Sequence, residues 1–369
     1  MSPAAPVNAS GSPPRRRWRR YRFVPLGCAA LALLLGLWTG LWRLGLPLPG
    51  AFPALAEFHG ALMIAGFLGT LISLERAVAL GRWWAYVAPA VSAIAAVLLI
   101  AGATHYAALA FLLAGLALTF DSLVVVRHQP ALFTIMLAVA SACWSIGTAI
   151  WALGGHASEV TGWWLAFLVL TVAAERLELS RLLSPPPLSQ AMFVLAVLVI
   201  LAGVARGELA GERADISGLG LLALTAWLIK HDIARRTVRM RGQTRFSAAC
   251  MLSGYFWLGA AGLLLILVPP GSAAFSYDAA VHAVTVGFVL SMIFAHAPIV
   301  LPAVVGLRVK YSAALYAPLV LLHLSLLLRI ATDLLAWTDW RGVTGPMTVL
   351  ALLGYAGTLI VVSRGKRPA

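Results

Sequence analysis

Residues 279–305 read AAVHAVTVGFVLSMIFAHAPIVLPAVV and contain no Lys, Arg, Asp or Glu. An α-helix rises about 1.5 Å per residue, so about 20 apolar residues cross the roughly 30 Å hydrocarbon core of a bilayer. The stretch is therefore long enough to span a membrane as one helix. Ionisable side chains are costly at that depth, which makes His282 and His296 within it candidates for function.

Similar apolar runs fill the rest of the chain. Its 369 residues are 61% hydrophobic and 11% charged, whereas soluble domains are about 45–50% apolar and about 25% charged. The sequence therefore predicts an all-α polytopic membrane protein of about twelve transmembrane helices in a single domain, 23–362, between a disordered basic tail at 1–22 and a cytoplasmic tail at 363–369. The expected spans are 23–45, 54–76, 84–102, 105–126, 131–153, 162–182, 188–205, 216–233, 246–268, 279–305, 311–330 and 343–362.

The net charge of +14 is distributed around the expected spans. Clusters of Lys and Arg beside spans lie on the cytoplasmic side, so we expect both termini in the cytoplasm of a bacterial inner membrane. In that orientation 22 of the 27 Lys and Arg residues lie inside. This pattern favours the lipid bilayer over nucleic acid as the partner of the positive charge. The five cations outside are Arg43, Arg206, Arg213, Arg329 and Arg341.

Two histidines at matching depth suggest a cofactor site. His59 lies about one turn into the second expected span from the outer side, and His282 lies about one turn into the tenth. Two neutral imidazoles that face each other at one depth can bind a haem iron from both sides, as in b-type cytochromes. Haem propionates need cations, and Arg43, Arg329 and Arg341 stand near outer span ends. No Cys-x-x-Cys-His motif occurs, which excludes covalent c-type haem.

Two further histidines lie deeper in the expected bundle. His296 follows His282 on the same face of the helix but about 21 Å further along its axis, so it cannot ligate the same iron. A second metal site formed by His296 and His323, with copper as the metal, is a further hypothesis. It would need a kink at Pro298 or Pro302 to bring the two rings to one depth.

Charged residues occur at the inner ends of two spans, as Glu75-Arg76 and as Glu175-Arg176. Neighbouring Glu and Arg residues at the interface predict ion pairs that fix helix orientation, and proton uptake from the cytoplasm is the alternative. Asp121 lies inside the fourth span, and the sequence identifies no partner for it.

The segments 59–75 and 282–298 resemble the second and tenth spans of the haem–copper oxidase catalytic subunit, a twelve-helix fold. The chain is also similar to the NnrS family of haem- and copper-containing membrane proteins linked to the nitric oxide response. The resemblance implies that His59 and His282 ligate haem b.

The sequence departs from both families at their copper motifs. Oxidases carry His-x-His on the tenth span, whereas Ala-Val follows His282, and residues 160–206 contain no histidine for the oxidase copper. The His-Ala-His-Glu motif of NnrS proteins is absent too, and a dioxygen-reducing oxidase is not expected.

The sequence thus predicts a membrane-embedded b-type haem protein that acts in electron transfer, or in handling or sensing a small gas such as nitric oxide. Its redox partner would be a membrane or periplasmic protein, and an oxidoreductase-related activity stays open. Two other classes remain. Twelve spans with few charges also describe many secondary transporters of small solutes, and an assembly subunit without a cofactor would have the same composition.

Overall fold

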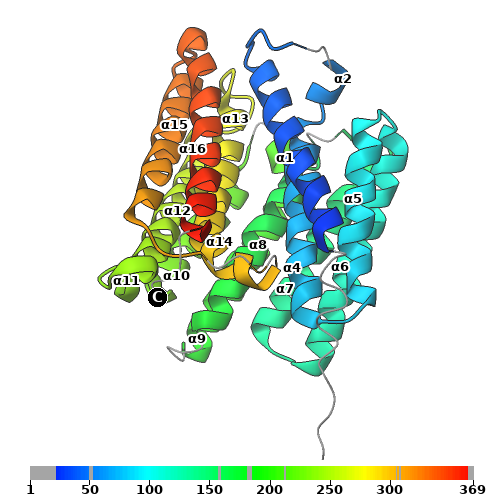
Figure 1. The fold of residues 1–369 in the computed structure, drawn as a ribbon, viewed down its shortest axis with the longest axis vertical. Coiled ribbons are helices and arrows are strands. Elements are labelled where there is room, and N and C mark those ends of the chain that lie inside the picture. The colour runs from blue at the N-terminus through cyan, green and yellow to red at the C-terminus, as the bar shows by residue number, and fades with distance from the viewer. Residues whose placement is uncertain are drawn as a thin grey trace, which may run out of the picture.

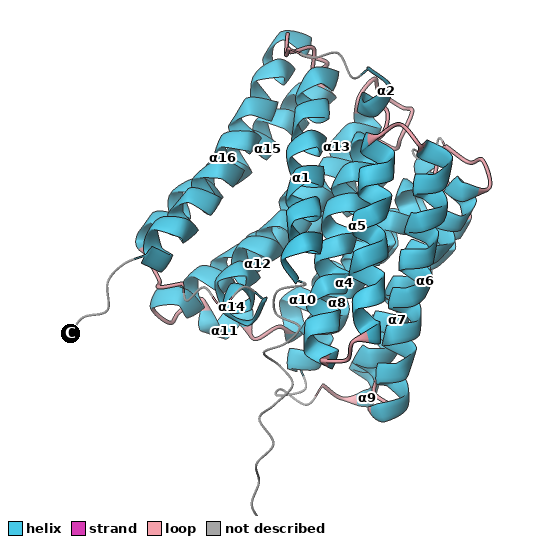
Figure 2. Ribbon diagram, turned by 45° about the vertical axis from the view of Figure 1, so that its right-hand side comes forward, coloured by secondary structure: helices cyan, strands magenta, loops and turns pink. Residues whose placement is uncertain are grey.

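The structure, a computed structural model, describes residues 22–49, 53–156, 159–180, 185–211, 213–304, 306 and 309–364. The expected tails before residue 22 and after residue 364, and the cations Arg181 and Arg308, lie outside these ranges. Over the described ranges the chain forms helices and loops and no β-strand (Figure 2). The all-α prediction is confirmed.

Each of the first six expected spans corresponds to a helix or to a run of joined helices. These are α1 (Phe23–Arg43), the run α3 (His59–Ala61), η3 (Leu62–Gly69) and α4 (Thr70–Leu80), then α5 (Val87–Ile100), α6 (Thr104–His128), α7 (Leu132–Ala152) and α8 (Thr161–Ser180). The short elements α2 (Pro53–Ala56) and η4 (Trp84–Tyr86) precede the second and third of them.

The other six expected spans also correspond to helices. These are α9 (Pro187–Ala205), α10 (Asp215–His231), α12 (Gly242–Leu267), the run α13 (Ser276–His282), η7 (Ala283–Val289) and α14 (Leu290–Val304), then α15 (Tyr316–Leu334) and α16 (Thr338–Arg364). Short elements between them are η6 (Glu208–Ala210), α11 (Ala234–Thr237) and η8 (Ala313–Leu315).

Within the described residues, nine helices are long and apolar enough to cross a membrane, which marks the chain as a helical membrane protein. The expected spans outside this group are α5, α8 and α10. With η4, α5 forms a shorter apolar helix, Trp84–Ile100, and α10 has 17 residues. The last two turns of α8 carry Glu175, Arg176 and Glu178, which lower its apolar character.

Helices that follow one another in the chain pack side by side, and the last returns to the first. From α5 to α8 the helices pack in sequence order, α10 packs between α9 and α12, and α15 packs on α16. Helix α16 then contacts α1, so the first and last helices close the bundle (Figure 1). Helix α8 also contacts η7, so elements of both halves of the chain meet in the interior.

Two of the helical runs contain a π-helical segment close behind a histidine. Segment η3 begins three residues after His59, and η7 begins directly after His282. π-Helical turns are rare and occur often at functional sites. The packing around η7 is close, because a Cβ at Gly287 would lie 2.5 Å from the Cβ of Trp257 on α12.

Candidate functional site

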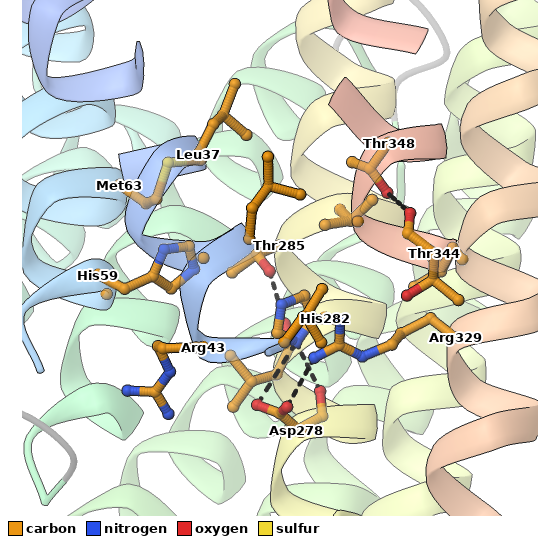
Figure 3. Close-up of a pocket in the computed structure, with 18 of the residues that line it drawn as sticks. Leu37, Arg43, His59, Met63, Asp278, His282, Thr285, Arg329, Thr344 and Thr348 are labelled. Atoms are coloured by element: carbon orange, nitrogen blue, oxygen red, sulfur yellow. Dashed lines mark hydrogen bonds and ion pairs between the residues drawn. The ribbon is translucent and has the colours of Figure 1, made fainter. Parts of the chain in front are cut away.

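A cavity of about 500 Å³ lies between α1, α3, α13, α15 and α16. Pockets for small molecules and cofactors commonly have about 300–1,000 Å³. Figure 3 shows His59 and His282 on different helices that border it. The structure brings all five residues that the sequence associates with a cofactor to this one cavity: His59, His282, Arg43, Arg329 and Arg341.

The His59 ring packs against the backbone of α1. Its Nδ1 lies 2.7 Å from the carbonyl oxygen of Gly36. Because a carbonyl oxygen only accepts hydrogen bonds, Nδ1 carries the proton and donates it, and Nε2 keeps its lone pair. No hydrogen bond to that Nε2 occurs among the described residues. Gly40 gives the ring its space, since a Cβ there would lie 2.8 Å from Cε1 of His59.

The His282 ring has the same arrangement on its own helix. Its Nδ1 donates to the carbonyl oxygen of Asp278, one turn earlier, over 2.8 Å. The Oδ1 atom of Asp278 is a further neighbour, 3.8 Å from the same Nδ1. No hydrogen bond to the Nε2 atom of His282 occurs within the described ranges. Both rings therefore present an unprotonated nitrogen without a partner, and both line the same cavity.

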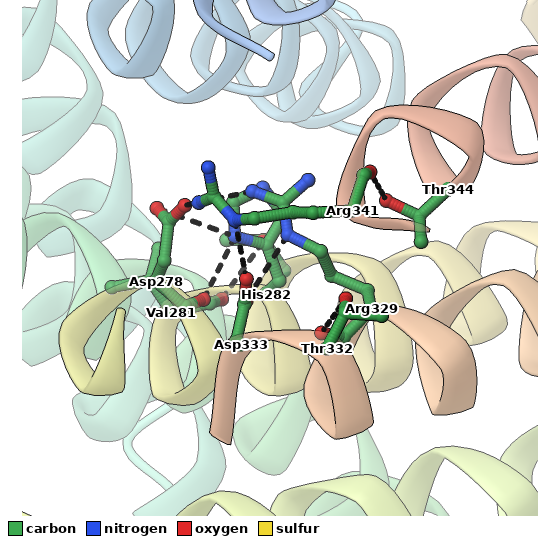
Figure 4. Close-up of polar contacts among 9 residues, drawn as sticks. Asp278, Val281, His282, Arg329, Thr332, Asp333, Arg341 and Thr344 are labelled. Atoms are coloured by element: carbon green, nitrogen blue, oxygen red, sulfur yellow. Dashed lines mark hydrogen bonds and ion pairs between the residues drawn. The ribbon is translucent and has the colours of Figure 1, made fainter. Parts of the chain in front are cut away.

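Two arginines and two aspartates form a closed network at the rim of the cavity (Figure 4). Arg329 donates from Nη2 to Asp278 over 2.7 Å and from Nε to Asp333 over 3.1 Å. Arg341 donates from Nε to Asp333 over 2.5 Å, and its Nη2 also contacts Asp278. The two positive and two negative charges cancel, so the network is neutral as a whole.

Arg43 lines the same cavity from the end of α1 and lies outside this network. Its Nη1 donates a long hydrogen bond of 3.4 Å to the carbonyl oxygen of Ala56. No carboxylate in the described part of the chain lies within 4 Å of its guanidinium group. Arg43 is therefore better placed than Arg329 or Arg341 to bind the anionic group of a ligand in the cavity.

A family model described as a domain of unknown function (DUF8744) matches residues 22–364. The chain belongs to this family. No curated protein and no solved structure matches the chain. The matched range includes every residue that lines the cavity.

The other two histidines that the sequence proposed as metal ligands contact different partners in this DUF8744 protein. Arg176 donates from Nη2 to the Nε2 atom of His296 over 2.6 Å, which occupies the lone pair of that ring. The indole nitrogen of Trp257 donates to the Nδ1 atom of His323 over 2.9 Å, so the proton of that ring is on Nε2. In the structure both rings therefore bond to other side chains. No group of three or more His, Cys, Asp or Glu with metal-site geometry occurs among the described residues.

The charged residues of α4 and of the C-terminal end of α8 do meet. Arg76 lies 3.8 Å from the carboxylate of Glu175, as an ion pair between the two helices. Asp121 on α6 is buried, and its Oδ2 has no hydrogen-bonding partner within the described residues.

Sequence reasoning missed several residues of the site. Asp278 stands four residues before His282 and Asp333 stands four residues after Arg329, so each lies on the same helix face as a predicted site residue. That spacing was a signal that could have found both aspartates. The two glycines of α1 that hold His59, Gly36 and Gly40, gave no such signal, because their contact joins two separate helices.

Proposed function

We propose that this DUF8744 protein is a membrane-embedded b-type haem protein, with His59 and His282 as axial ligands, that acts in electron transfer or in handling or sensing a small gas such as nitric oxide. The observation that carries this proposal is the state of the two rings, which line one cavity with Nδ1 bound to a backbone carbonyl and Nε2 without a partner. Metal-binding histidines commonly donate their second nitrogen in this way, which fixes the tautomer and the ring orientation.

The surroundings of the two rings suit a flat apolar group with an anionic edge. The cavity walls carry leucines of α1 and aliphatic residues of α16, and Arg43 supplies a cation that no carboxylate in the described ranges neutralises. Haem bound there would supply one-electron redox chemistry. The residues of the chain would hold it, orient it and exclude water from it.

The proposal includes twelve spans with both termini in the cytoplasm of a bacterial inner membrane. Helices α5, α8 and α10 would then cross the bilayer together with the nine longer apolar helices. Burial supports the inclusion of α8, because Arg176 is only 5% exposed and faces His296 rather than lipid. Charged residues of a span are expected to face the interior of a bundle in this way.

Reduced-minus-oxidised absorbance spectra of the purified protein test the haem site. The wild type should show a b-type band, and His59→Ala and His282→Ala should each lose it, because a six-coordinate centre needs both rings. Both variants should also unfold at lower temperature, since haem that binds only the folded state stabilises it by mass action.

His323→Ala is the matched control, because that histidine lies in the same bundle on Trp257 and does not line the cavity. It should keep the band. A His282→Ala protein with a full, unshifted b-type band would contradict the proposal.

The same cavity also suits the rival function of a secondary transporter for a small solute. The observation that favours it is the pair of π-helical segments η3 and η7, since transporter sites are typically lined by interrupted helices. A wild-type protein that is purified from haem-replete cells without any b-type band would favour the transporter.

A further inference from the structure

We infer that the cavity receives its ligand from the lipid bilayer, through the contact between α1 and α16, and that the ligand is a membrane-soluble flat amphiphile with a carboxylate. The inference rests on the proposed haem site and adds the source of the ligand and its route. Haem belongs to this chemical class, because it combines an apolar ring with acidic side groups.

The wall of the cavity at this contact carries aliphatic side chains on both sides. Helix α1 contributes Leu37 and Leu41, the next residue after it contributes Leu44, and α16 contributes Val349 and Leu352. Apolar walls of this kind give no partner to water, whereas they match the acyl chains of lipid and the apolar face of an amphiphile. Polar groups line the cavity as well, from α3, α13 and α15, from Arg43 at the end of α1 and from Arg341, Thr344 and Thr348 of α16.

No hydrogen bond or ion pair joins α1 to α16 among the described residues. By contrast, α16 is bound to α15 by the Ser325–Thr348 hydrogen bond, at 2.9 Å, and to α14 by the hydroxyl of Tyr355, which donates to the carbonyl oxygen of Phe294 over 2.6 Å. Separation of α1 from α16 therefore breaks only apolar contacts, which lipid can replace.

At Gly345 of α16 the neighbouring atoms from the end of α1 belong to flexible side-chain ends. A Cβ at Gly345 of α16 would lie 2.6 Å from Cδ1 of Leu44 and 2.7 Å from Cδ2 of Leu41. Leucine side chains can change rotamer to open such a contact on the nanosecond scale.

Among the nine long apolar helices in the described ranges, these two have the smallest buried fraction. Only 28% of the apolar stretch of α1 and 17% of that of α16 are buried inside the protein. They are the first and last helices of the chain, so no loop connects them directly (Figure 1). Their separation therefore strains no short connection.

A reversible cross-link between α1 and α16 tests the route. We would place cysteines at Leu44 and Gly345 in a Cys28→Ala background, because the two positions are in contact, with Cδ1 of Leu44 2.6 Å from the Cβ position of Gly345. Haem-free protein from haem-starved cells is reconstituted in liposomes, haemin is added to the bilayer, and growth of the bound-haem Soret band is followed. The oxidised pair should load about ten-fold more slowly or worse, because the loading rate falls with the open fraction. After reduction and removal of the reductant, the same sample should load as the Cys28→Ala parent does.

The matched control is a cysteine pair at Pro318 and Gly354, which joins α15 to α16 outside the cavity. A Cβ at Gly354 would lie 3.7 Å from the Cβ of Pro318, within the usual range for a disulfide. Its oxidation should leave the loading rate unchanged. If the first pair does not accumulate in membranes, a pair at Leu41 and Gly345 replaces it.

Equal loading rates for the oxidised and reduced α1–α16 pair would overturn the inferred route and leave the haem site intact. Absence of the band in the reduced pair and in the wild type, even after long incubation, would overturn the haem site itself. The two results are distinct, so failure of the route is not mistaken for failure of the proposed function.

Discussion

At the scale of single residues, the position of the His59 ring depends on two glycines one turn apart on α1. Gly36 offers its carbonyl oxygen to Nδ1, and Gly40 leaves room for the ring itself. A Cβ at Gly40 would lie 2.8 Å from Cε1 and 3.0 Å from Nδ1 of His59, closer than side chains tolerate. The ring is thus held between the helix backbone and the cavity.

Gly40→Ala should weaken haem binding although it removes no ligand. The added methyl group pushes the imidazole away from Gly36 and breaks the hydrogen bond that orients it. Loss of such a supporting contact typically costs about 10–100-fold in metal affinity. Titration of the haem-free protein with haemin, read at the Soret band, measures the change in affinity.

Gly27→Ala is the control for this prediction, because Gly27 lies on the same helix with no heavy atom within 4 Å of its Cβ position. It should bind haemin as the wild type does. A Gly40→Ala protein with unchanged affinity would mean that the His59 ring does not need its present orientation.

The sequence allowed His59 and His282 to be paired because depth can be counted along a helix from its end. Arg43, Arg329 and Arg341 could be assigned to the same region by the same count, and all of them line one cavity. The sequence could not show that the charges of Arg329 and Arg341 are neutralised. Their neutralisation depends on Asp333 and Asp278, whose side chains reach the arginines only when α13, α15 and α16 pack together.

At the scale of elements, the four-residue network ties α13, α15 and α16 together at the rim of the cavity. Asp333 is central to it, with a side chain that is 0% exposed and accepts from both Arg329 and Arg341. Removal of one member of a buried ion network leaves the remaining charges uncompensated, which costs several kcal/mol.

Asp333→Asn should therefore lower the free energy of unfolding by roughly 3–5 kcal/mol, since it keeps the shape of the side chain and removes only its charge. Thermal unfolding in detergent measures the loss. Asp339→Asn, an exposed residue at the start of α16, should change it little. Equal unfolding temperatures for the two variants would show that solvent already screens the network.

The π-helical segments η3 and η7 are the elements that sequence patterns did not predict. Apolar residues surround each segment, so no change of hydrophobic period marks the extra residue in the turn. The consequence is local but relevant to the site, because a wider turn after His59 and after His282 changes the direction of each ring relative to the C-terminal part of its helical run.

At the scale of the whole molecule, the apolar runs were sufficient to predict every long helix, since each expected span coincides with a helix or a joined run. Hydropathy fixes where helices occur but not which helices touch. The return of α16 to α1 and the central position of α8 arise from side-chain packing between remote segments, which a single sequence does not reveal. The sequence could therefore predict that His59 and His282 lie near each other. It could not predict the shape or size of the cavity between them.

The orientation of the whole chain in the membrane can be tested directly. In the proposed orientation 22 of the 27 Lys and Arg residues are cytoplasmic, and a wrong count of spans would scramble this division. Reporters fused after Gly365 and near Gly242 should both read as cytoplasmic, and one near Gly211 should read as periplasmic. A periplasmic signal after Gly365 would require an odd number of spans. It would also remove the basis for placing His59 and His282 at the outer end, although their shared cavity would remain, because packing alone defines it.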